Sequence, residues 1–350
     1  MLTSTKGGSG KSVVAIGMFL KFRDDEGKNL GYFKPIGDKM SMTPKTRTDK
    51  DVNVISAVVA RKFSKEEICP QFLSPGYFLD EVTLEETGQI KEKIKDTYQS
   101  MVSKGLDVMI IEGNHSCNQF RSISLDDAYF AKEFDSEVII CCPVSDDDDI
   151  NDLVSVYDWY KCQGINVKGV ILNGVSDNAF TRIEQYHKPL LEKLGIPFIG
   201  GLKKSKQLEK PTISEIMEAV NGRLIVGNYI KVKYNTIEGF VIGAMGSESA
   251  VSYLRRGRDK CVITGGDRSD IALAALETST ALIIFTGNIE PAPHIQSKAE
   301  EKGIPLIVAP GDTYTVSEQV KKIHTHIQPN EIGICKEQAD KYLDWEKVLE

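Results

Sequence analysis

The chain has 350 residues, a length that suits two domains of ordinary size better than one small core. Its formal net charge of -7 argues against a nucleic-acid groove, which would show a basic stripe. No apolar run reaches the length of a membrane span, and the N-terminus lacks a signal-peptide pattern. We therefore expect a cytoplasmic protein with neither a nucleic-acid nor a membrane partner.

The N-terminal residues predict a phosphate-binding loop. A short strand at residues 1–5 leads into a glycine-rich turn, and a helical pattern follows at residues 13–22. Glycines let several backbone N–H groups converge on an anion at a helix N-terminus. We expect Lys11 to reach the β- and γ-phosphates and Ser12 to ligate Mg²⁺. The predicted nucleotide-binding residues of this loop are Thr5, Lys6, Gly7, Gly8, Ser9, Gly10, Lys11, Ser12 and Val13.

The loop departs from the usual pattern because Thr5 stands where the first glycine is expected. Lys6-Gly7-Gly8-Ser9-Gly10-Lys11-Ser12 resembles the variant loop of ATPases related to the partition, septum-site and nitrogenase-iron proteins, whose extra lysine often acts across a dimer. The resemblance implies a homodimer and makes Lys6 a candidate catalytic residue. The alternative is a glycine-rich turn that holds no ligand.

Strand-length apolar runs alternate with helical patterns over the first two hundred residues. Buried parallel strands are predicted at 29–34, 108–112, 137–143 and 167–173, and helices at 13–23, 84–104, 150–163 and 181–194. This alternation predicts a doubly wound, mostly parallel α/β sheet with ligands at the carboxyl ends of its strands. The weak periodicity and the prolines of residues 39–78 predict loops over one sheet edge, and such loops often bind substrate.

Three polar residues stand at predicted strand ends, where parallel strands share one rim. Glu112 suits a Mg²⁺ ligand, although a carboxylate there can also cap a turn. Lys34, held before a proline, is expected to contact a phosphate or carboxylate as a catalytic cation, with a solvated charge as the alternative. The amide of Asn173 could bind adenine or form a turn.

Other polar residues near these strands carry weaker signals. Residues 146–149 are four consecutive aspartates before a helix, and we expect them to cap its N–H groups rather than to bind a cation. His115 is interpreted as structural or solvated, with a catalytic role as the alternative. Cys141 and Cys142 are adjacent on a strand and point to opposite faces, so we expect two buried hydrophobic residues rather than a metal site.

A polar, lysine-rich stretch at residues 203–210 marks the predicted domain boundary. The predicted organisation is a first domain at 1–204, a linker at 205–212, a second α/β domain at 213–332 and a C-terminal helix at 333–350. In the second domain we expect helices at 214–220 and 270–277 and strands at 240–244, 260–264 and 281–286. Residues 337–349 fit one amphipathic helix whose apolar side chains are available for docking or a dimer contact.

The motifs TKGGSGKS, YFKPIG, IIEG, GVILNGV and LGIPFIGGL, in this order, resemble the dethiobiotin synthetase-like ATPases, especially the N-terminal domain of long phosphate acetyltransferases. The resemblance implies that Lys34 contacts phosphate or substrate, that Glu112 takes Mg²⁺ and that Asn173 faces adenine. The chain departs from the synthetases after Pro35 and at residues 114–116, where Asn-His-Ser replaces small glycine-rich residues. Carboxylation of a biotin precursor is therefore not expected.

A second glycine-containing turn lies in the second domain. Gly265, Gly266, Asp267 and Arg268 follow a strand, open a helix and resemble the core motif of the DRTGG domain, a resemblance that covers most of residues 211–330. It implies a regulatory ligand-binding or dimerisation module with a candidate ligand site at these four residues. A tight turn fixed by an Asp267–Arg268 pair is the alternative. In long phosphate acetyltransferases a separate catalytic domain follows, so we do not expect a complete phosphate acetyltransferase.

These patterns predict an α/β protein: a P-loop NTPase with a mostly parallel, doubly wound sheet, followed by a smaller α/β DRTGG-type domain. The predicted cofactors are ATP and Mg²⁺, and the predicted partners are a nucleotide, an unidentified small-molecule substrate or effector and a second copy of the chain. The leading hypothesis is an ATPase or ATP-dependent ligase-like enzyme that acts by phosphoryl transfer. The alternatives are a non-catalytic nucleotide sensor that regulates a partner enzyme and a scaffold with a vestigial loop.

Overall fold

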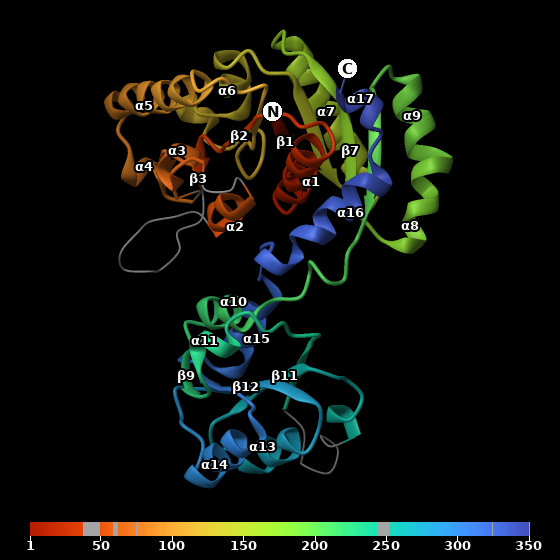
Figure 1. Cartoon of the computed structure of the whole chain (residues 1–350). Helices are drawn as coiled ribbons and strands as arrows, with labels where there is room; N and C mark the ends of the chain where they lie inside the picture. Colours follow the sequence, from red (N-terminus) through yellow and green to blue (C-terminus); the bar gives the residue numbers. More distant parts are fainter. Residues whose placement is uncertain (38–49, 59–61, 75, 244–251, 324, 350) are drawn as a thin grey trace. The chain divides into compact units, whose positions relative to one another are not determined.

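The computed structural model describes residues 1–37, 50–58, 62–74, 76–243, 252–323 and 325–349 (Figure 1). The chain forms two compact units, a first unit of Met1–Ser205 with Ile327–Glu350 and a second unit of Lys206–His326. This division differs from the predicted borders. A separate C-terminal helix was predicted at residues 333–350, whereas these residues pack with the first unit. No helix among the described residues is both long enough and apolar enough to cross a membrane.

The first unit alternates strands and helices along most of its length. Its strands are β1 (Leu2–Ser4), β2 (Leu30–Phe33), β3 (Ile36–Gly37), β4 (Gln71–Phe72), β5 (Val108–Ile111), β6 (Val138–Pro143), β7 (Val167–Val175) and β8 (Phe198–Lys203). Its helices are α1 (Lys11–Asp24), α2 (Lys50–Val58), α3 (Lys65–Ile68), α4 (Phe78–Glu81), α5 (Leu84–Val102), α6 (Asp127–Glu133), α7 (Asp148–Cys162), α8 (Asp177–Arg182), α9 (Lys188–Lys193), α16 (Ile332–Tyr342) and α17 (Trp345–Leu349).

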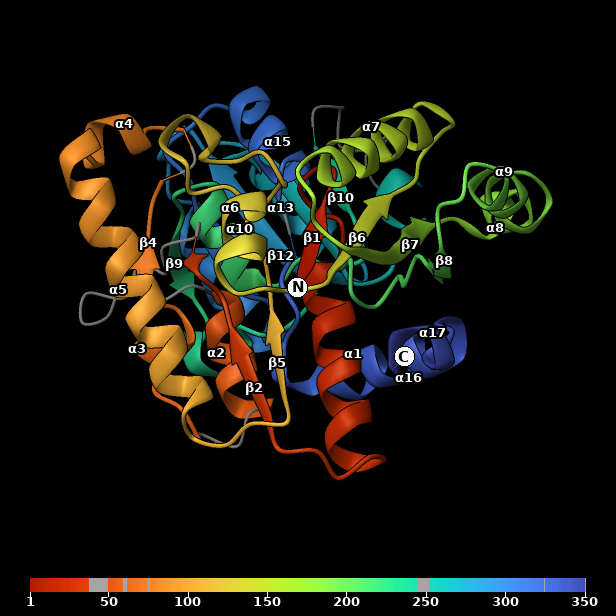
Figure 2. The ribbon, with the colours of Figure 1, turned by 90° about the horizontal axis from the view of Figure 1, so that it is seen from above.

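Parallel pairing places the strand ends of the first unit on one rim. One sheet has the order β1-β6-β7-β8, and β2 pairs with β5. A parallel bridge between Leu2 and Glu112 links the β2–β5 pair to β1, so the strands follow one another across the unit in Figure 2. Because these strands pair in parallel, the residues after β1, β2, β5, β6 and β7 come together at the carboxyl edge. The predicted parallel sheet is confirmed.

Helices cover both faces of this sheet. On β6, Ile139 and Cys141 face a core that includes α1, α5 and α16, whereas Ile140 and Cys142 face a second core that includes α7 and α9. A strand buried on both faces reads as a continuous apolar run, which is why β6 was predictable. Both cysteines are fully buried, as predicted.

The second unit is also an α/β layer structure. Its strands are β9 (Arg223–Val226), β10 (Phe240–Ile242), β11 (Lys260–Gly265), β12 (Thr280–Thr286) and β13 (Leu306–Val308). Its helices include α10 (Ile213–Ala219), α11 (Tyr229–Val232), α13 (Ser269–Leu276), α14 (Pro293–Lys302) and α15 (Thr313–Lys321). The sheet order is β10-β11-β12-β13-β9, in which β9 alone runs antiparallel. Helices α13 and α14 pack on one face and α10 and α15 on the other.

Two predicted elements of the first unit differ from the structure. The single helix predicted at 181–194 is interrupted, since a π-helix at Ile183–His187 separates α8 from α9. The region predicted as loops at 39–78 contains α2, α3 and β4 in its described part, and β4 pairs with β3. Residues 39–49, also covered by that prediction, lie outside the described residues.

The C-terminal segment corrects a third prediction. The helix predicted at 337–349 is two helices, α16 and α17, separated at Leu343 and Asp344. Leu343 pairs with Gly200 of β8, and the backbone N–H of Asp344 donates to the Ile199 carbonyl at 2.8 Å. The Trp345 ring meets Phe22 of α1 edge to face, with 6.2 Å between ring centroids. The apolar side chains expected to serve docking or a dimer are thus largely used within the first unit.

Candidate functional site

The glycine-rich loop joins β1 to α1 at the carboxyl edge of the sheet. Gly8 and Gly10 have φ values of 70° and 71°, in the left-handed region that favours glycine. Gly10 is the N-cap of α1 and offers no capping side chain, so the first N–H groups of the helix are left for another acceptor. The Ser9 hydroxyl is buried and has no hydrogen-bond partner among the described residues. These features fit a loop built to hold an anion.

Lys11 is buried at the start of α1. Its Nζ donates to Ser4 Oγ at 2.7 Å and to the His115 carbonyl at 3.3 Å. Burial lowers the pKa of the Lys11 ammonium, and the nearby Glu112 carboxylate opposes this shift. A cation that loses hydration in this way gains most from an anionic ligand. Lys11 therefore has the position and the environment of a phosphate-binding lysine.

Ser12 and Glu112, the two predicted Mg²⁺ ligands, lie together. Ser12 Oγ donates to Glu112 Oε1 at 2.9 Å, and Tyr32 Oη donates to Glu112 Oε2. Burial raises the pKa of Glu112, while Lys34 favours its charged form. A hydroxyl beside a poorly solvated carboxylate is a donor set of the hard oxygen type that Mg²⁺ prefers. The residues present therefore fit this metal.

Lys34 adds a second buried cation at the end of β2. Its Nζ lies 3.4 Å from Asp51 Oδ2 of α2, and both side chains are buried. Asp51 belongs to the region 39–78 that was predicted as loops over one sheet edge. The pairing holds the Lys34 ammonium in the protein interior and ties α2 to the rim.

Lys6 and Asn173 contact neighbours within the same chain. Lys6 forms an ion pair with Asp149 of α7, and about half of the lysine side chain is exposed. Asn173 Nδ2 donates to the Ser9 carbonyl at 2.6 Å and therefore braces the loop. A lysine acting across a dimer and an amide that faces adenine stay predictions.

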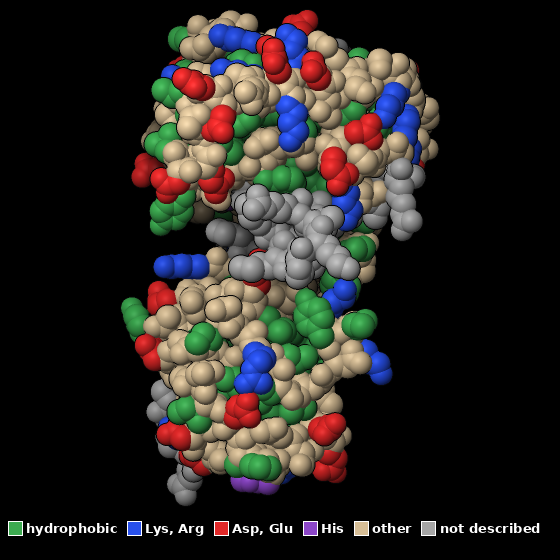
Figure 3. Space-filling model, turned by 90° about the vertical axis from the view of Figure 1, so that its left-hand side faces the viewer, with side chains coloured by type: hydrophobic (Ala, Val, Ile, Leu, Met, Phe, Trp, Pro, Cys, Tyr) green, Lys and Arg blue, Asp and Glu red, His purple; other side chains and the backbone are tan. Residues whose placement is uncertain are grey.

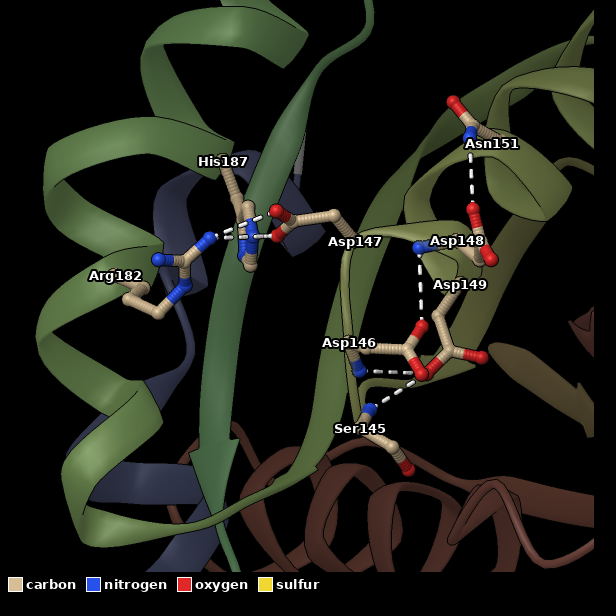
Figure 4. A network of polar contacts seen from close by, with 8 residues as sticks. All are labelled: Ser145, Asp146, Asp147, Asp148, Asp149, Asn151, Arg182 and His187. Carbon is tan, nitrogen blue, oxygen red and sulfur yellow. Dashed lines mark hydrogen bonds and ion pairs between the residues drawn. The ribbon is translucent and has the colours of Figure 1, made fainter.

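The four aspartates serve different partners, as Figure 4 shows for residues around the start of α7. Asp149 accepts the backbone N–H groups of Ser145 and Asp146, and Asp147 pairs with Arg182 and His187. Asp147 is the N-cap of α7 but makes no side-chain capping bond, whereas Asp146 Oδ1 accepts the backbone N–H of Asp148, the first residue of α7, at 3.0 Å. The predicted capping role is therefore confirmed for Asp146 and not for Asp147. Across the described ranges, no group of three or more acidic, histidine or cysteine residues is arranged to hold a metal ion.

Sequence analysis missed a buried carboxylate beneath the loop, Asp127. Its Oδ1 accepts the Asn114 backbone N–H at 2.7 Å, and its Oδ2 accepts the Thr3 hydroxyl. Burial raises the pKa of Asp127 to about 7, although both hydrogen bonds oppose the shift. Asp127 thus fixes β1 to the segment that follows β5.

The glycine turn of the second unit has a different environment. Arg268 bonds Asp270, and the Asp267 carboxylate adds a weaker electrostatic attraction to the same guanidinium. Gly266 packs so closely that a Cβ would lie 2.1 Å from the Ile289 carbonyl oxygen. Close packing alone therefore explains why position 266 is a glycine, and a ligand at this turn stays a prediction.

Surface charge is mixed on the face drawn in Figure 3. Basic and acidic side chains are interspersed on both units, and neither sign forms a continuous field there. Among the described side chains drawn on this face, no basic stripe of the kind that binds a nucleic-acid backbone is seen.

Comparison with known proteins agrees with this geometry. A family model described as "AAA domain" matches residues 1–212, and one described as "DRTGG domain" matches residues 215–323. The phosphate acetyltransferase of Nitrosomonas europaea is 22% identical over 93% of this chain and 47% of the relative. The ATP-dependent dethiobiotin synthetase of Clostridium perfringens is 28% identical over 61% of this chain and 93% of the relative. The MinD structure of Pyrococcus horikoshii is 13% identical, with a TM-score of 0.36, and covers 59% of this chain and 82% of that chain.

These matches cover different shares of the chain and of its relatives. The chain spans about half the length of the phosphate acetyltransferases it matches. The AAA match, in contrast, covers more than half of this chain and contains the loop, both buried lysines and Glu112. The chain therefore belongs to the AAA domain family, as a P-loop protein in which this domain is followed by a DRTGG domain.

Proposed function

We propose that the first unit binds Mg-ATP and catalyses phosphoryl transfer, as an ATPase or an ATP-dependent ligase-like enzyme. The observation that carries the proposal is the burial of Lys11, Lys34 and Glu112, which are 7%, 4% and 3% exposed, around one glycine-rich loop. Charged side chains are rarely buried without a function or a partner, because their desolvation is unfavourable. An anionic ligand with its metal ion would offset this cost.

The proposed roles follow from the contacts. Lys11 and Lys34 would bind the phosphates and stabilise their charge, and Ser12 and Glu112 would hold Mg²⁺. When bound, the metal ion would supply neutralisation of charge on the β- and γ-phosphate oxygens. The acceptor would be water or a carboxylate or carbamate of a small substrate. The match to an ATP-dependent dethiobiotin synthetase supports the ligase-like form.

The proposal extends to regulation and assembly. The second unit would act as a regulatory module, a role that its match to the DRTGG domain supports. The variant loop with Lys6 supports a homodimer, in which this lysine would leave Asp149 for the neighbouring subunit. A cytoplasmic location would give this site access to Mg-ATP.

A non-catalytic nucleotide sensor is the second candidate. It is favoured by the ion pair between Lys6 and Asp149, since a lysine held in this way does not assist γ-phosphate transfer. Such a protein would bind ATP and ADP with negligible turnover and would signal to a partner enzyme.

Phosphate release and calorimetry on the full chain test both candidates. The wild type should release phosphate from Mg-ATP, and Lys11→Ala should lower that rate by on the order of 10²–10³ because one electrostatic contact to the phosphates is lost. Lys95→Ala serves as the matched control, because Lys95 is an exposed lysine paired with Glu133 on the surface.

The outcomes separate the candidates. Turnover that persists unchanged in Lys11→Ala would contradict the enzyme proposal, whereas tight binding of both nucleotides without phosphate release would favour the sensor. A wild-type chain that binds neither ATP nor ADP would contradict both.

A further inference from the structure

His115 lies against the glycine-rich loop in a way that neither the motif nor the family match assigns. A Cβ built at Gly7 would lie 1.5 Å from His115 Nε2 and 2.1 Å from its Cε1. The imidazole edge, with its Nε2 atom foremost, therefore fills the space beside the Gly7 backbone. Only glycine at position 7 permits this approach.

The backbone around His115 is held firmly. The N–H groups of Gly113 and Cys117 donate to the carbonyls of Leu2 and Ser4, each at 2.8 Å. The N–H of His115 itself donates to Gln119 Oε1 at 2.8 Å. The segment after β5 is thus anchored along β1, so the backbone that carries the imidazole is fixed by the fold.

His115 is also joined to the phosphate-binding lysine. Its carbonyl accepts Lys11 Nζ at 3.3 Å and Ser4 Oγ at 3.0 Å. In phosphate-binding loops the lysine reaches the β- and γ-phosphates, while the backbone N–H groups cradle the phosphates nearer the nucleoside. A residue that contacts Lys11 with its carbonyl and Gly7 with its ring therefore borders the terminal phosphate.

We propose that His115 is a catalytic residue that contacts the γ-phosphate through Nε2–H and lets the site distinguish a nucleoside triphosphate from a diphosphate. The inference rests on the proposed function and names a further determinant of the same site. A neutral or a protonated imidazole can supply this donor, and a hydrogen bond to a phosphate oxygen is of the strong, charge-assisted type.

Nucleotide affinity measured by calorimetry on the full chain tests the inference without relying on turnover. The probes are Mg-ADP and the β,γ-imido analogue of ATP with Mg²⁺. His115→Leu and His115→Gln are similar in size, but only glutamine retains an N–H donor near the Nε2 position. His115→Leu should weaken analogue binding by about 10-fold to 100-fold, the value of a hydrogen bond to a charged group, and leave ADP affinity within about twofold.

His115→Gln and a control variant complete the experiment. His115→Gln should recover part of the lost analogue affinity, and it also serves if the leucine variant fails to fold. His294→Phe, at an exposed histidine of the second unit, should bind both nucleotides as the wild type does.

Three results would overturn the inference. If His115→Leu keeps the wild-type ratio of analogue to ADP affinity, the imidazole does not contact the γ-phosphate. If both nucleotides weaken equally, His115 supports the loop only. If the wild type binds neither nucleotide, the proposed function itself is wrong. The first two results, in contrast, contradict only the role given to His115.

Discussion

The two glycine turns of this chain have the same local pattern and different surroundings. In the first unit, a parallel strand leads through Gly7, Gly8 and Gly10 into α1; in the second, β11 leads through Gly265 and Gly266 into α13. Around the first turn, α1 and the end of β2 each supply a buried lysine, and the end of β5 and α2 each supply a buried carboxylate. Around the second, the charged pair Arg268 and Asp270 is substantially exposed.

The hydroxyls at the second rim satisfy one another. Thr286 Oγ1 lies 2.8 Å from Thr313 Oγ1 and donates to the Thr264 carbonyl at 3.3 Å. Buried polar groups that are already paired gain little from a ligand, whereas desolvated charges gain much. The comparison supports the proposal that a glycine turn after a strand becomes a phosphate site through the charges that other strand ends bring to it.

The largest expected effect is on nucleotide affinity after substitution of Gly10. Its φ is 71°, and a Cβ would lie 1.8 Å from Asn173 Nδ2. Gly10→Ala should therefore distort the loop and weaken Mg-ATP binding by on the order of 10²–10³, as is typical when aligned donors to a charged group are lost. Calorimetric titration of the full chain measures this change.

The matched substitution in the second unit is Gly266→Ala, in which a Cβ would meet the Ile289 carbonyl oxygen. It should lower the thermal stability of the second unit and leave Mg-ATP affinity unchanged. A loss of affinity in Gly266→Ala as large as that in Gly10→Ala would show that the two turns are functionally equivalent, contrary to this account.

The next effect concerns the ion pairs at the two rims. Asp51→Ala removes the carboxylate 3.4 Å from the buried Lys34 ammonium, and we expect a destabilisation of about 3 kcal/mol, at the low end for a broken buried pair because Glu112 also faces this lysine. Asp270→Ala removes a partner of Arg268 at the surface and should change the free energy of unfolding by less than about 1 kcal/mol. Urea unfolding gives both values. Equal losses of unfolding free energy in the two variants would contradict the difference drawn between the two rims.

The last expected effect, the smallest per step of the variable that is changed, is a pH dependence from Asp127. Its native pKa is raised to about 7, so the folded chain binds more protons than the unfolded chain between about pH 4 and pH 7. The wild type should therefore lose stability relative to Asp127→Asn as pH rises through this window, by at most on the order of 1.4 kcal/mol per pH unit, and the difference should level off above it.

Urea unfolding of both chains at several pH values measures that difference, and the comparison cancels the titration of groups shared by the two chains. A difference in unfolding free energy that stays constant from pH 4 to pH 7 would contradict the raised pKa.

Local sequence accounts for the parts of the fold and site that were predictable. The loop, β2, β5, β6 and β7 carry their own signals, because glycine spacing and apolar runs do not depend on distant residues. Strands β9 and β13 received no prediction, since each has only three or four residues and pairs with a partner about eighty residues away. Short strands of this kind are specified by tertiary packing and not by their own pattern.

The local sequence pattern also did not predict which residues contact the site residues. Asp51 and Asp127 lie in segments with no recognisable motif, whereas Asp149 belongs to the aspartate run that was expected to cap a helix. The contacts with Lys34, Thr3 and Lys6 form only when the fold brings these residues together. The C-terminal segment shows the same limit. Its apolar stripe was visible in the sequence, but whether α1 and β8 or a second chain would cover that stripe depended on the fold.

Hydrogen exchange of the full chain with and without Mg-ATP tests most directly whether the first rim, and not the second, is the nucleotide site. Backbone amides in the loop and the following turn of α1, residues 5–14, and in the segment 112–117 should exchange more slowly with nucleotide bound, because ligand binding suppresses local opening. Amides at residues 264–270 should not change. Slowed exchange at 264–270 with none at 5–14 would contradict the account.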